Sequence, residues 1–276
     1  MTKKRSLGCS AIDSLIRKEA GNGPHFLIAN PEISAGRKVA VCIGDSITRG
    51  QVSCDYVEML QAELRRDFCF VNAGINGELS FNVLGRLDDV VRCNPDYITL
   101  LIGTNDAHAM IDSRSLKRAR RYMMVAEAPS IDRFEGNLRK IISYLQEHTV
   151  AQIAILSIPP IGEDLGDLAM RLTALFCRAA KEAASGCGVA YLPLFEEMMA
   201  VLEQRQRRPS KHDGYTDLLL VGNIIHERLF RLSYDAIAAR RQFALHTDLL
   251  HLSCAGAEIV ARVIKPFLQG SHPPRA

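Results

Sequence analysis

Three side chains of this 276-residue chain have the types needed for nucleophilic catalysis. Ser46 offers a hydroxyl in the segment Gly44-Asp45-Ser46, although a serine is a poor nucleophile without an adjacent base. His251 could be that base, because an imidazole titrates near neutral pH. Asp248, three residues earlier, could orient the ring and stabilise its charged form. We therefore expect Ser46, Asp248 and His251 to act together on a carbonyl group.

A second set of groups could bind the negative charge that develops on a carbonyl oxygen under attack. The backbone N–H of Gly77 stands at a position where close approach is possible, because glycine has no side chain. Asn105 offers a side-chain amide, and Ser46 adds its own N–H. Loss of one such donor typically costs about 2.7–4 kcal/mol of barrier. We expect Gly77 and Asn105 to be oxyanion donors.

Each of these segments also has an ordinary structural explanation. Residues 44–46 and 103–106 have compositions typical of turns, and the Asp-x-x-His segment at 248–251 could cap a helix. Their joint placement favours the chemical interpretation. Residues 44–46, 72–78 and 103–106 follow predicted strands, and residues 248–251 precede the last predicted helix. Ligands of an open parallel sheet bind beyond the carboxyl ends of its strands.

Five short β-rich runs must position these loops. They are continuously apolar rather than alternating, which is typical of strands that are covered on both faces. Helical patterns lie between them, and strand–helix alternation predicts right-handed crossovers and a parallel α/β sheet. The predicted strands are residues 38–43, 68–72, 97–102, 151–157 and 188–192.

Three amphipathic helices are predicted between or after these strands. Two have apolar residues at helical spacing, Phe134 to Leu145 and Leu168 to Ala179, with Leu168, Leu172, Leu175, Phe176 and Ala179 on one face of the second. Asp132 and Glu135 resemble a capping pair at the start of the first. The third is expected to begin at Ser253 as N-cap and to end or kink at Pro266.

With these blocks the chain resembles the SGNH hydrolases, also called GDSL esterases/lipases. Residues 44–46 match the first block of the family, and Gly103 to Asp106 match the third, in which Asn105 is the oxyanion donor. Asn76-Gly77-Glu78 matches the second block best, with Gly74 as an alternate oxyanion glycine. Asp248 and His251 match the fifth. The resemblance spans residue 38 to about residue 267.

The resemblance implies a fold and a reaction. The fold would be a three-layer, flavodoxin-like α/β/α sandwich with a five-stranded parallel sheet. The reaction would be hydrolysis of carboxylic (acyl) esters of small molecules through an acyl-enzyme, with no metal and no organic cofactor. Asp45 and Asp106 would support the loops by hydrogen bonds and would not take part in the chemistry.

Two alternative functions stay open at this point. One is a carbohydrate O-acetylesterase or acyltransferase, against which the absence of tryptophan and of an export signal argues. The other is a binding protein that kept the fold without turnover. The complete set of Ser46, Asn105, Asp248 and His251 argues against the second, since a retired site need not keep all four.

Composition and charge limit the partners and the location. The net charge of +3 is too small to indicate a nucleic acid or a membrane surface, and no apolar run is long enough for a membrane span. The eight cysteines contain no C-x-x-C pair, so we expect buried reduced thiols and a cytoplasmic protein. Cys254 is expected to be a small apolar residue in the first turn of a helix. His108 and His246 are expected to be loop histidines rather than metal ligands.

We expect the chain to consist of an N-terminal extension, residues 1–35, and one domain, residues 36–276. An insertion at about 196–247 carries an apolar stripe from Leu218 to Leu232, which could pack in the core or form a lid over Ser46. Two basic runs could attract an anionic substrate or be solvated faces. They are Arg114, Lys117, Arg118, Arg120 and Arg121, and then Arg205, Arg207, Arg208, Lys211 and His212. The oligomeric state is not indicated.

Overall fold

The structure is a computed structural model that describes residues 20–205 and 232–270. Its centre is a five-stranded sheet with the strand order β2-β1-β3-β4-β5, and all neighbouring strands are parallel. This confirms the parallel α/β sheet, and the order 2-1-3-4-5 is that of flavodoxin-like folds. The strands are β1 (Lys38–Gly44), β2 (Phe68–Gly74), β3 (Tyr97–Leu101), β4 (Gln152–Leu156) and β5 (Ala190–Leu192), all within the predicted runs or one to two residues from them.

The register of the central strands aligns the ends from which the polar loops leave. Gly44, the last residue of β1, lies beside Gly74 of β2 and Leu101 of β3. The chain runs from β1 outward to β2 and then crosses to β3 on the other side of β1. The loops after these three strands therefore begin at one edge of the sheet, next to the point where the strand order reverses.

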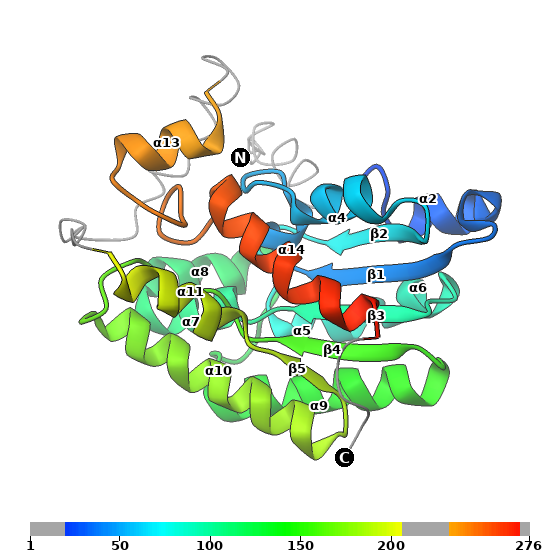
Figure 1. Ribbon diagram of the computed structural model, residues 1–276. Helices are drawn as coiled ribbons and strands as arrows, with labels where there is room; N and C mark the ends of the chain where they lie inside the picture. Colours follow the sequence, from blue (N-terminus) through cyan, green and yellow to red (C-terminus); the bar gives the residue numbers. More distant parts are fainter. Residues whose placement is uncertain (1–19, 206–231, 271–276) are drawn as a thin grey trace, which may run out of the picture.

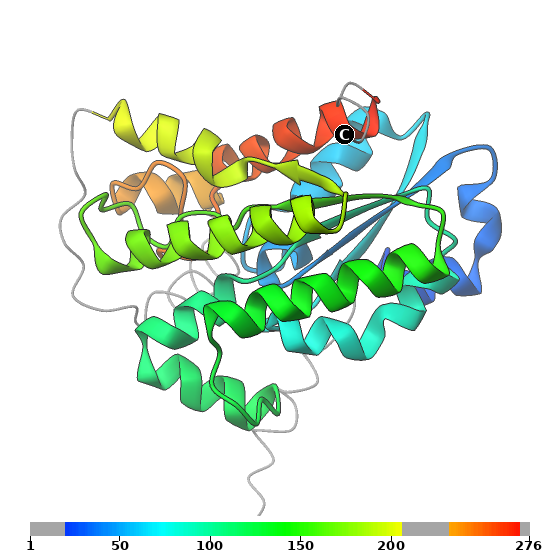
Figure 2. The ribbon, with the colours of Figure 1, turned by 90° about the horizontal axis from the view of Figure 1, so that it is seen from below.

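Helices cover both faces of the sheet, which explains why its strands are apolar throughout (Figure 1). Val39, Val41 and Ile43 of β1 belong to one core cluster, whereas Ala40 and Cys42 belong to the other. Residues of α2 (Pro24–Ala29), α6 (Leu87–Arg92), α9 (Ile131–His148) and α10 (Leu168–Gly186) contribute to the first cluster. The second cluster contains residues of α4 (Tyr56–Leu64), α11 (Leu194–Glu203) and α14 (Cys254–Leu268). Figure 2 shows α9 and α14 on opposite sides of the sheet.

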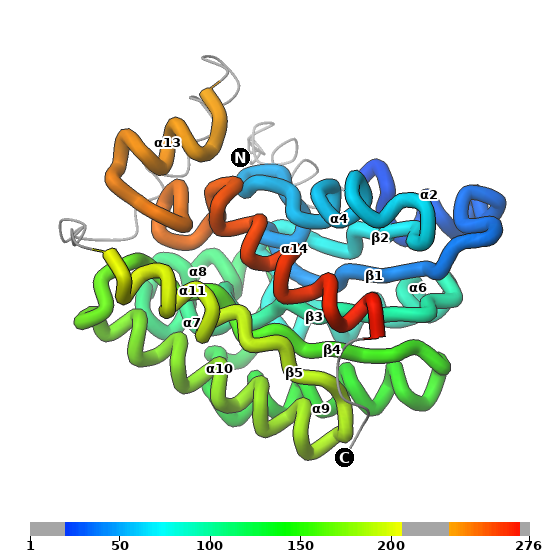
Figure 3. Tube along the Cα trace, in the orientation of Figure 1, coloured from blue at the N-terminus to red at the C-terminus, as the bar shows by residue number. Residues whose placement is uncertain are grey.

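Shorter elements line the carboxyl edge of the sheet or flank it. The tube in Figure 3 shows α13 beside the start of α14, where the Asp235 carboxylate accepts hydrogen bonds from the N–H groups of Cys254 and Ala255. These elements are α3 (Ser46–Arg49), α5 (Ser80–Val83), α7 (Thr104–Ile111), α8 (Ser113–Tyr122), α13 (Tyr234–Arg240) and the 3-10 helices η1 (Pro31–Ser34) and η2 (Leu84–Arg86).

Helix α9 has the predicted apolar face but a different cap. Phe134, Leu138 and the other predicted apolar residues of this face are buried. The N-cap is Ser130, whose hydroxyl accepts the N–H of Arg133 at 3.2 Å, so the predicted pair of Asp132 and Glu135 is wrong. A serine just before the first turn can reach the free N–H groups there, which leaves Glu135 for an ion pair with Arg139.

The predicted apolar face of α10 is only partly right. Phe176 and Ala179 are buried, but Leu168 is 63% and Leu175 is 36% exposed. The helix instead turns its small residues inward, among them Ala169, Ala180, Ala183 and Ala184. Small side chains allow a close approach to the sheet and to α9, and Phe176 meets Phe134 with ring centroids 4.9 Å apart.

Helix α14 begins as predicted. Ser253 is its N-cap and accepts the N–H of Gly256. Pro266 neither ends the helix at once nor starts a loop, because α14 continues to Leu268. The proline lacks the one N–H that would bond four residues back, and the helix ends only two residues after it.

The terminal extension and the insertion are described only in part. Within residues 20–35, α2 packs against α6 and β2. Of the apolar stripe from Leu218 to Leu232, only Leu232 falls within the described residues, so the structure does not test whether this stripe packs in the core or forms a lid. No helix among residues 20–205 and 232–270 is long and apolar enough to cross a membrane.

Candidate active site

Ser46 lies at the first position of α3, immediately after β1. Asp45 is the N-cap, and its Oδ1 accepts the N–H of Ile47 at 3.0 Å. A side chain at Gly44 would collide with Thr48 and with the carbonyl oxygen of Leu101, so only glycine permits this sharp strand-to-helix turn. Ser46 is 8% exposed, at the carboxyl edge of the sheet.

Asp248 and His251 lie in the loop that leads into α14. Asp248 Oδ1 accepts the N–H groups of Leu250 and His251 at 3.1 and 2.8 Å, while its Oδ2 lies 2.8 Å from His251 Nδ1. Nε2 of the same ring lies 3.0 Å from Ser46 Oγ. In the neutral ring the carboxylate fixes the proton on Nδ1, and Nε2 then accepts from the serine hydroxyl. The structure thus brings Ser46, His251 and Asp248 into one hydrogen-bonded chain.

The charges of this pair shift both pKa values. Burial lowers the pKa of His251, but the charge and hydrogen bond of Asp248 outweigh burial, so the pKa of His251 is raised above its ordinary value. Burial raises the pKa of Asp248, but the charge of His251 and the hydrogen bonds to the carboxylate lower it by more. The pKa of Asp248 is therefore below its ordinary value. The carboxylate is therefore charged at neutral pH and favours the imidazolium form of its partner.

Gly77 and Asn105 lie just after β2 and β3. Gly77 lies in the turn after β2 at a φ of +78°, a conformation that favours glycine. Asn105, on the first turn of α7, donates from Nδ2 to the carbonyl oxygen of Glu78 at 3.0 Å and to Asp45 Oδ2 at 3.2 Å. The Asn105 amide therefore joins the Gly77 loop to the loop that carries Ser46.

Gly74, the alternate oxyanion glycine, has a different environment. It is the last residue of β2, and a Cβ there would lie 2.3 Å from the backbone nitrogen of Arg49. Its missing side chain lets α3 rest directly on β2. The Gly74 N–H already donates to Asn72 Oδ1 at 3.0 Å, so Gly77 stays the better candidate for an oxyanion donor.

Asp45 and Asp106 bind the surrounding loops, which confirms the hydrogen bonds expected of them. Asp106 accepts the N–H and the hydroxyl of Ser80 at 2.9 and 2.7 Å. Burial is the main cause that raises the pKa of Asp45 to about 7 and that of Asp106 to about 6. Asp45, which bonds to Asn105, is therefore only partly charged at neutral pH.

Several buried polar residues that hold these loops were not predicted. Ser53 bonds to Leu252, next to His251: its hydroxyl accepts the Leu252 N–H at 2.9 Å. Asn72 donates from Nδ2 to the Thr48 carbonyl at 2.8 Å, which fixes α3 on β2. An asparagine at the end of an apolar strand is the only sequence signal for the second, and Ser53 has none.

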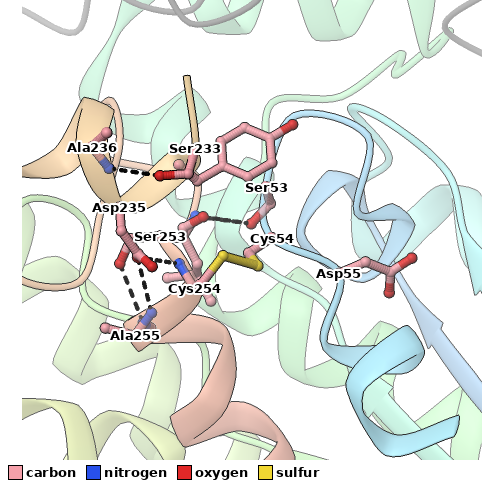
Figure 4. Close-up of a disulfide and its surroundings, with 12 residues drawn as sticks. Ser53, Cys54, Asp55, Ser233, Asp235, Ala236, Ser253, Cys254 and Ala255 are labelled. Carbon is pink, nitrogen blue, oxygen red and sulfur yellow. Dashed lines mark hydrogen bonds between the residues drawn. A yellow bond between two sulfur atoms is a disulfide. The ribbon is translucent and has the colours of Figure 1, made fainter. Parts of the chain in front are cut away.

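A disulfide joins Cys54 to Cys254, and its two Cα atoms are 5.0 Å apart (Figure 4). Cys254 is the first residue of α14, as expected, but the prediction that it is a reduced, small apolar residue is wrong. Cys54 follows Ser53 in the loop between α3 and α4. The pairing was not visible in the sequence, because 200 residues separate the partners and only the fold places them side by side.

The other described cysteines form no disulfide. Cys42, Cys69, Cys93 and Cys177 are buried, as expected of structural thiols, and burial raises the pKa of Cys42 to about 12. Disulfides persist mainly in oxidising compartments, so the Cys54–Cys254 bond is unexpected in a cytoplasmic protein. The cytoplasmic location stays a prediction.

The two singled-out histidines have structural partners. His108 lies on α7 and not in a loop, with Nδ1 3.1 Å from the Ser115 hydroxyl, and burial lowers its pKa to about 4. His246 lies in the loop before α14, and its Nδ1 is 3.1 Å from Glu163 Oε1. Across the described residues, no group of three His, Cys, Asp or Glu side chains is arranged to hold a metal ion.

The two basic runs occupy different environments. The first lies on α8, and within it the charge of Arg118 lowers the pKa of His251. In the second run, Arg205 is bound to the buried carboxylate of Glu163. Residues 206–212 lie outside the described part of the chain.

The sequence supplies the family. Residues 42–259 match the GDSL-like lipase/acylhydrolase family, a span that includes both Ser46 and His251. The chain belongs to this family. It is therefore a carboxylic ester hydrolase, and the predicted SGNH resemblance is confirmed. No curated protein matches the chain.

Solved structures of similar fold are esterases and a lipase. A variant of the acetyl-xylooligosaccharide esterase Axe2 from Geobacillus stearothermophilus has a TM-score of 0.61 at 21% identity, covering 84% of this chain and 93% of that one. The lipase/acylhydrolase from Enterococcus faecalis has a TM-score of 0.56 at 19% identity, covering 87% and 99%. The acetyl xylan esterase AlAXEase has a TM-score of 0.58 at 18% identity, covering 83% and 99%. At these identities the likeness establishes the SGNH hydrolase fold.

Proposed function

We propose that this GDSL-family hydrolase cleaves small-molecule carboxylic esters through an acyl-enzyme on Ser46, with His251 as base and Asp248 as its partner. The observation that carries the proposal is the continuous chain of contacts, 3.0 Å from Ser46 Oγ to His251 Nε2 and 2.8 Å from Nδ1 to Asp248. These separations are within the reach that proton transfer between a nucleophile and its base requires.

In the first half of the reaction, Ser46 Oγ forms a bond to the carbonyl carbon of the ester. His251 Nε2 takes the hydroxyl proton at the same time, and the Asp248 carboxylate stabilises the resulting imidazolium. When the tetrahedral intermediate collapses, the bond from carbon to the alcohol oxygen breaks. His251 gives its proton to the departing alkoxide, and the acyl group stays on Ser46.

The oxyanion of the intermediate would be held by the N–H groups of Ser46 and Gly77 and by the Asn105 amide. Both protons of that amide already have acceptors, Glu78 and Asp45, and the contact with Asp45 is the longer of the two. A carbonyl oxygen that enters the site would take or share the proton now directed at Asp45. Partial protonation of Asp45 near neutral pH lowers the cost of that exchange.

In the second half, water replaces the alcohol. His251 removes a proton from the water, whose oxygen bonds to the acyl carbon, and the same donors hold the second oxyanion. Collapse breaks the bond to Ser46 Oγ, His251 returns the proton to this oxygen, and the carboxylic acid leaves. Every step uses groups of the chain, and no step calls for a cofactor.

Hydrolysis of O-acetyl groups on a carbohydrate is a second candidate. Its support is that acetylxylan esterases are among the solved structures of the same fold. The fold alone does not choose between simple esters and acetylated sugars. The third interpretation, a binding protein without turnover, is disfavoured by the hydrogen-bonded arrangement of Ser46, His251 and Asp248.

The proposal is tested by labelling with a fluorophosphonate, which reacts with activated serines. We expect the full-length protein to be labelled and the Ser46→Ala variant not to be. Ser185→Ala, which changes an exposed serine at the end of α10, is the matched control and should be labelled normally. Hydrolysis of p-nitrophenyl esters from acetate to long chains, compared with acetylated xylo-oligosaccharides, then separates the two candidate substrates. An unlabelled wild-type protein contradicts the proposal.

A further inference from the structure

Glu163 is a buried carboxylate that the mechanism above does not use. It follows β4 in the loop of residues 157–163, and its side chain is 0% exposed. A buried carboxylate is costly unless its oxygens are saturated with hydrogen bonds or paired with positive charge. Glu163 meets both conditions with partners that come almost entirely from the segment leading to Asp248 and His251.

The carboxylate binds three consecutive N–H groups of that segment. Oε1 accepts the N–H groups of Leu245 and His246 at 2.8 and 3.1 Å, and Oε2 accepts that of Ala244 at 2.9 Å. The ring of His246 adds a fourth contact, from Nδ1 to Oε1 at 3.1 Å. Hydrogen bonds to a charged acceptor are about twice as strong as neutral ones. Residues 244–246 are therefore fixed to the loop that follows β4.

Charge keeps this carboxylate ionised. Burial raises the pKa of Glu163, but the hydrogen bond and charge of His246 and the backbone N–H groups outweigh burial and lower the pKa to about 2. Arg205 adds an ion pair to Oε2 and donates to the carbonyl of Gln242. The anchor is thus charged across the pH range in which an ester hydrolase works.

The anchored residues are joined directly to the residues that hold His251. His246 forms an antiparallel bridge with Leu252, and the N–H of Thr247 donates to the His251 carbonyl at 2.8 Å. The preceding loop residue, Gly162, donates its N–H to the carbonyl of Leu249 at 2.8 Å. The loop after β4 thus contacts the Asp248–His251 loop both before and between these two residues.

We propose that Glu163 is a positioning residue, which holds the Asp248–His251 loop against the loop that follows β4, so that His251 Nε2 stays within hydrogen-bond distance of Ser46. The inference rests on the proposed function, because it assigns the purpose of the anchor to proton transfer at Ser46. Glu163 touches neither substrate nor reacting atoms. Its role is carried through residues 244–246.

The variant Glu163→Gln keeps the size of the side chain, removes its charge and places an NH₂ group against backbone donors. We expect kcat to fall by about 10- to 100-fold, because small displacements of a catalytic group have effects of this size. KM should change by less than twofold. Asp96→Asn is the matched control: Asp96 also accepts a backbone N–H, from Val39 at 2.7 Å, but at the opposite end of the sheet. It should lower Tm and leave kcat unchanged.

A proton NMR spectrum gives a readout that a loss of stability alone would not change. The proton shared by His251 Nδ1 and Asp248 should give a far-downfield signal in the wild type and in Asp96→Asn, and it should shift or weaken in Glu163→Gln. This signal needs no substrate. If the wild type hydrolyses no ester and is not labelled by a fluorophosphonate, the proposed function fails. The downfield signal then still shows whether Glu163 positions His251 against Asp248.

The proposal is overturned if folded Glu163→Gln keeps kcat within twofold of the wild type. It is also overturned if the downfield signal is unchanged, or if Asp96→Asn loses as much activity. Should Glu163→Gln not fold, Arg205→Gln decides, because the Arg205 side chain is partly exposed and its loss removes only one partner of the carboxylate. A fall in kcat of at least threefold at unchanged KM then supports the proposal, and an unchanged kcat overturns it.

Discussion

Cys54 and Cys254 join the two segments on which proton transfer depends. Cys54 lies eight residues after Ser46, and Cys254 lies three residues after His251. The bond is reinforced by the Cys54 N–H, which donates to the Leu252 carbonyl at 3.1 Å. The covalent link therefore fixes the start of α14 to the loop after α3, next to the contact between Ser46 and His251.

Removal of this bond should weaken both stability and catalysis. A disulfide that closes a loop of about 200 residues contributes roughly 5 kcal/mol in the chain-entropy model. We expect Cys54→Ser to lower Tm by several degrees or more and to reduce kcat, because the His251 loop loses its tether. Thermal unfolding and ester hydrolysis with and without a dithiol reductant measure both effects. Cys187→Ser, at a free and partly exposed cysteine, is the control. Equal Tm and kcat in Cys54→Ser and the wild type would contradict the prediction.

The pH dependence of kcat/KM should report His251. The base must be neutral to accept the Ser46 proton, and the net effect of Asp248 is to raise the pKa of His251 above its ordinary value of 6.5. The rise of kcat/KM with pH should therefore be centred above pH 6.5. The same shift stabilises the folded protein below pH 6.5, and that contribution is lost as pH rises through the folded-state pKa. A midpoint below pH 6.5 would show that another group controls the rate.

Asp45 should adjust this midpoint. Its negative charge helps to raise the pKa of His251, so Asp45→Asn should move the rise of kcat/KM to lower pH. The shift should be modest, because burial raises the pKa of Asp45 to about 7 and its charge is incomplete near neutrality. A pH series on this variant and on Asp88→Asn, an exposed carboxylate that accepts a hydrogen bond from Tyr144, separates the local effect from net charge. A midpoint that moves to higher pH in Asp45→Asn would contradict this prediction.

Gly77→Ala should reduce kcat by about 100-fold. An alanine at φ +78° is strained by roughly 1–2 kcal/mol, and its Cβ would lie 2.9 Å from the Met123 methyl group. A shift of the backbone that relieves the strain and the close contact moves the Gly77 N–H away from the oxyanion. Loss of one such donor lowers kcat by about 10²–10³-fold. Gly85→Ala is the control, since its Cβ would meet nothing within 4 Å. Unchanged kcat in a folded Gly77→Ala protein would remove Gly77 from the oxyanion site.

The sequence allowed the sheet and the loops at its edge to be predicted, because both depend on local patterns. Strands such as β1 are apolar on both faces, and Ser46, Gly77 and Asn105 each follow a strand within a few residues. Parallel strands end at a common edge, so the order of segments was sufficient to bring these residues together. The contact between His251 and Ser46 was predicted from the position of residues 248–251 before the last helix and from the resemblance to the SGNH hydrolases.

What could not be predicted depends on contacts between distant segments. The Cys54–Cys254 bond and the anchoring of residues 244–246 by Glu163 need the packed fold, and neither leaves a local signal. Leu168 and Leu175 were wrongly placed on the buried face of α10, because the leucine spacing outweighed the small residues that pack closely on the sheet. The hydrophobic pattern of a helix indicates that one of its faces is buried. Which face is buried depends on how closely its side chains can pack against the neighbouring elements.

Substitutions of the triad residues His251 and Asp248 are expected to lower kcat by different amounts. His251→Ala should lower kcat by several orders of magnitude, and Asp248→Ala should be milder because the imidazole keeps some ability to accept the proton without its partner. Both are read from single-turnover rates with a p-nitrophenyl ester, and the double variant should be little worse than His251→Ala alone. Full activity in His251→Ala would exclude the imidazole as the base.

The most direct test is to trap the acyl-enzyme and find the residue that carries it. The protein is mixed with excess p-nitrophenyl acetate, quenched in acid within the first turnover and measured by intact-protein and peptide mass spectrometry. One acetyl group is expected on the peptide that contains Ser46, with a matching burst of p-nitrophenolate, and neither should occur in Ser46→Ala. An acetyl group on another residue, or hydrolysis of the ester by Ser46→Ala at the wild-type rate, would contradict Ser46 as the nucleophile.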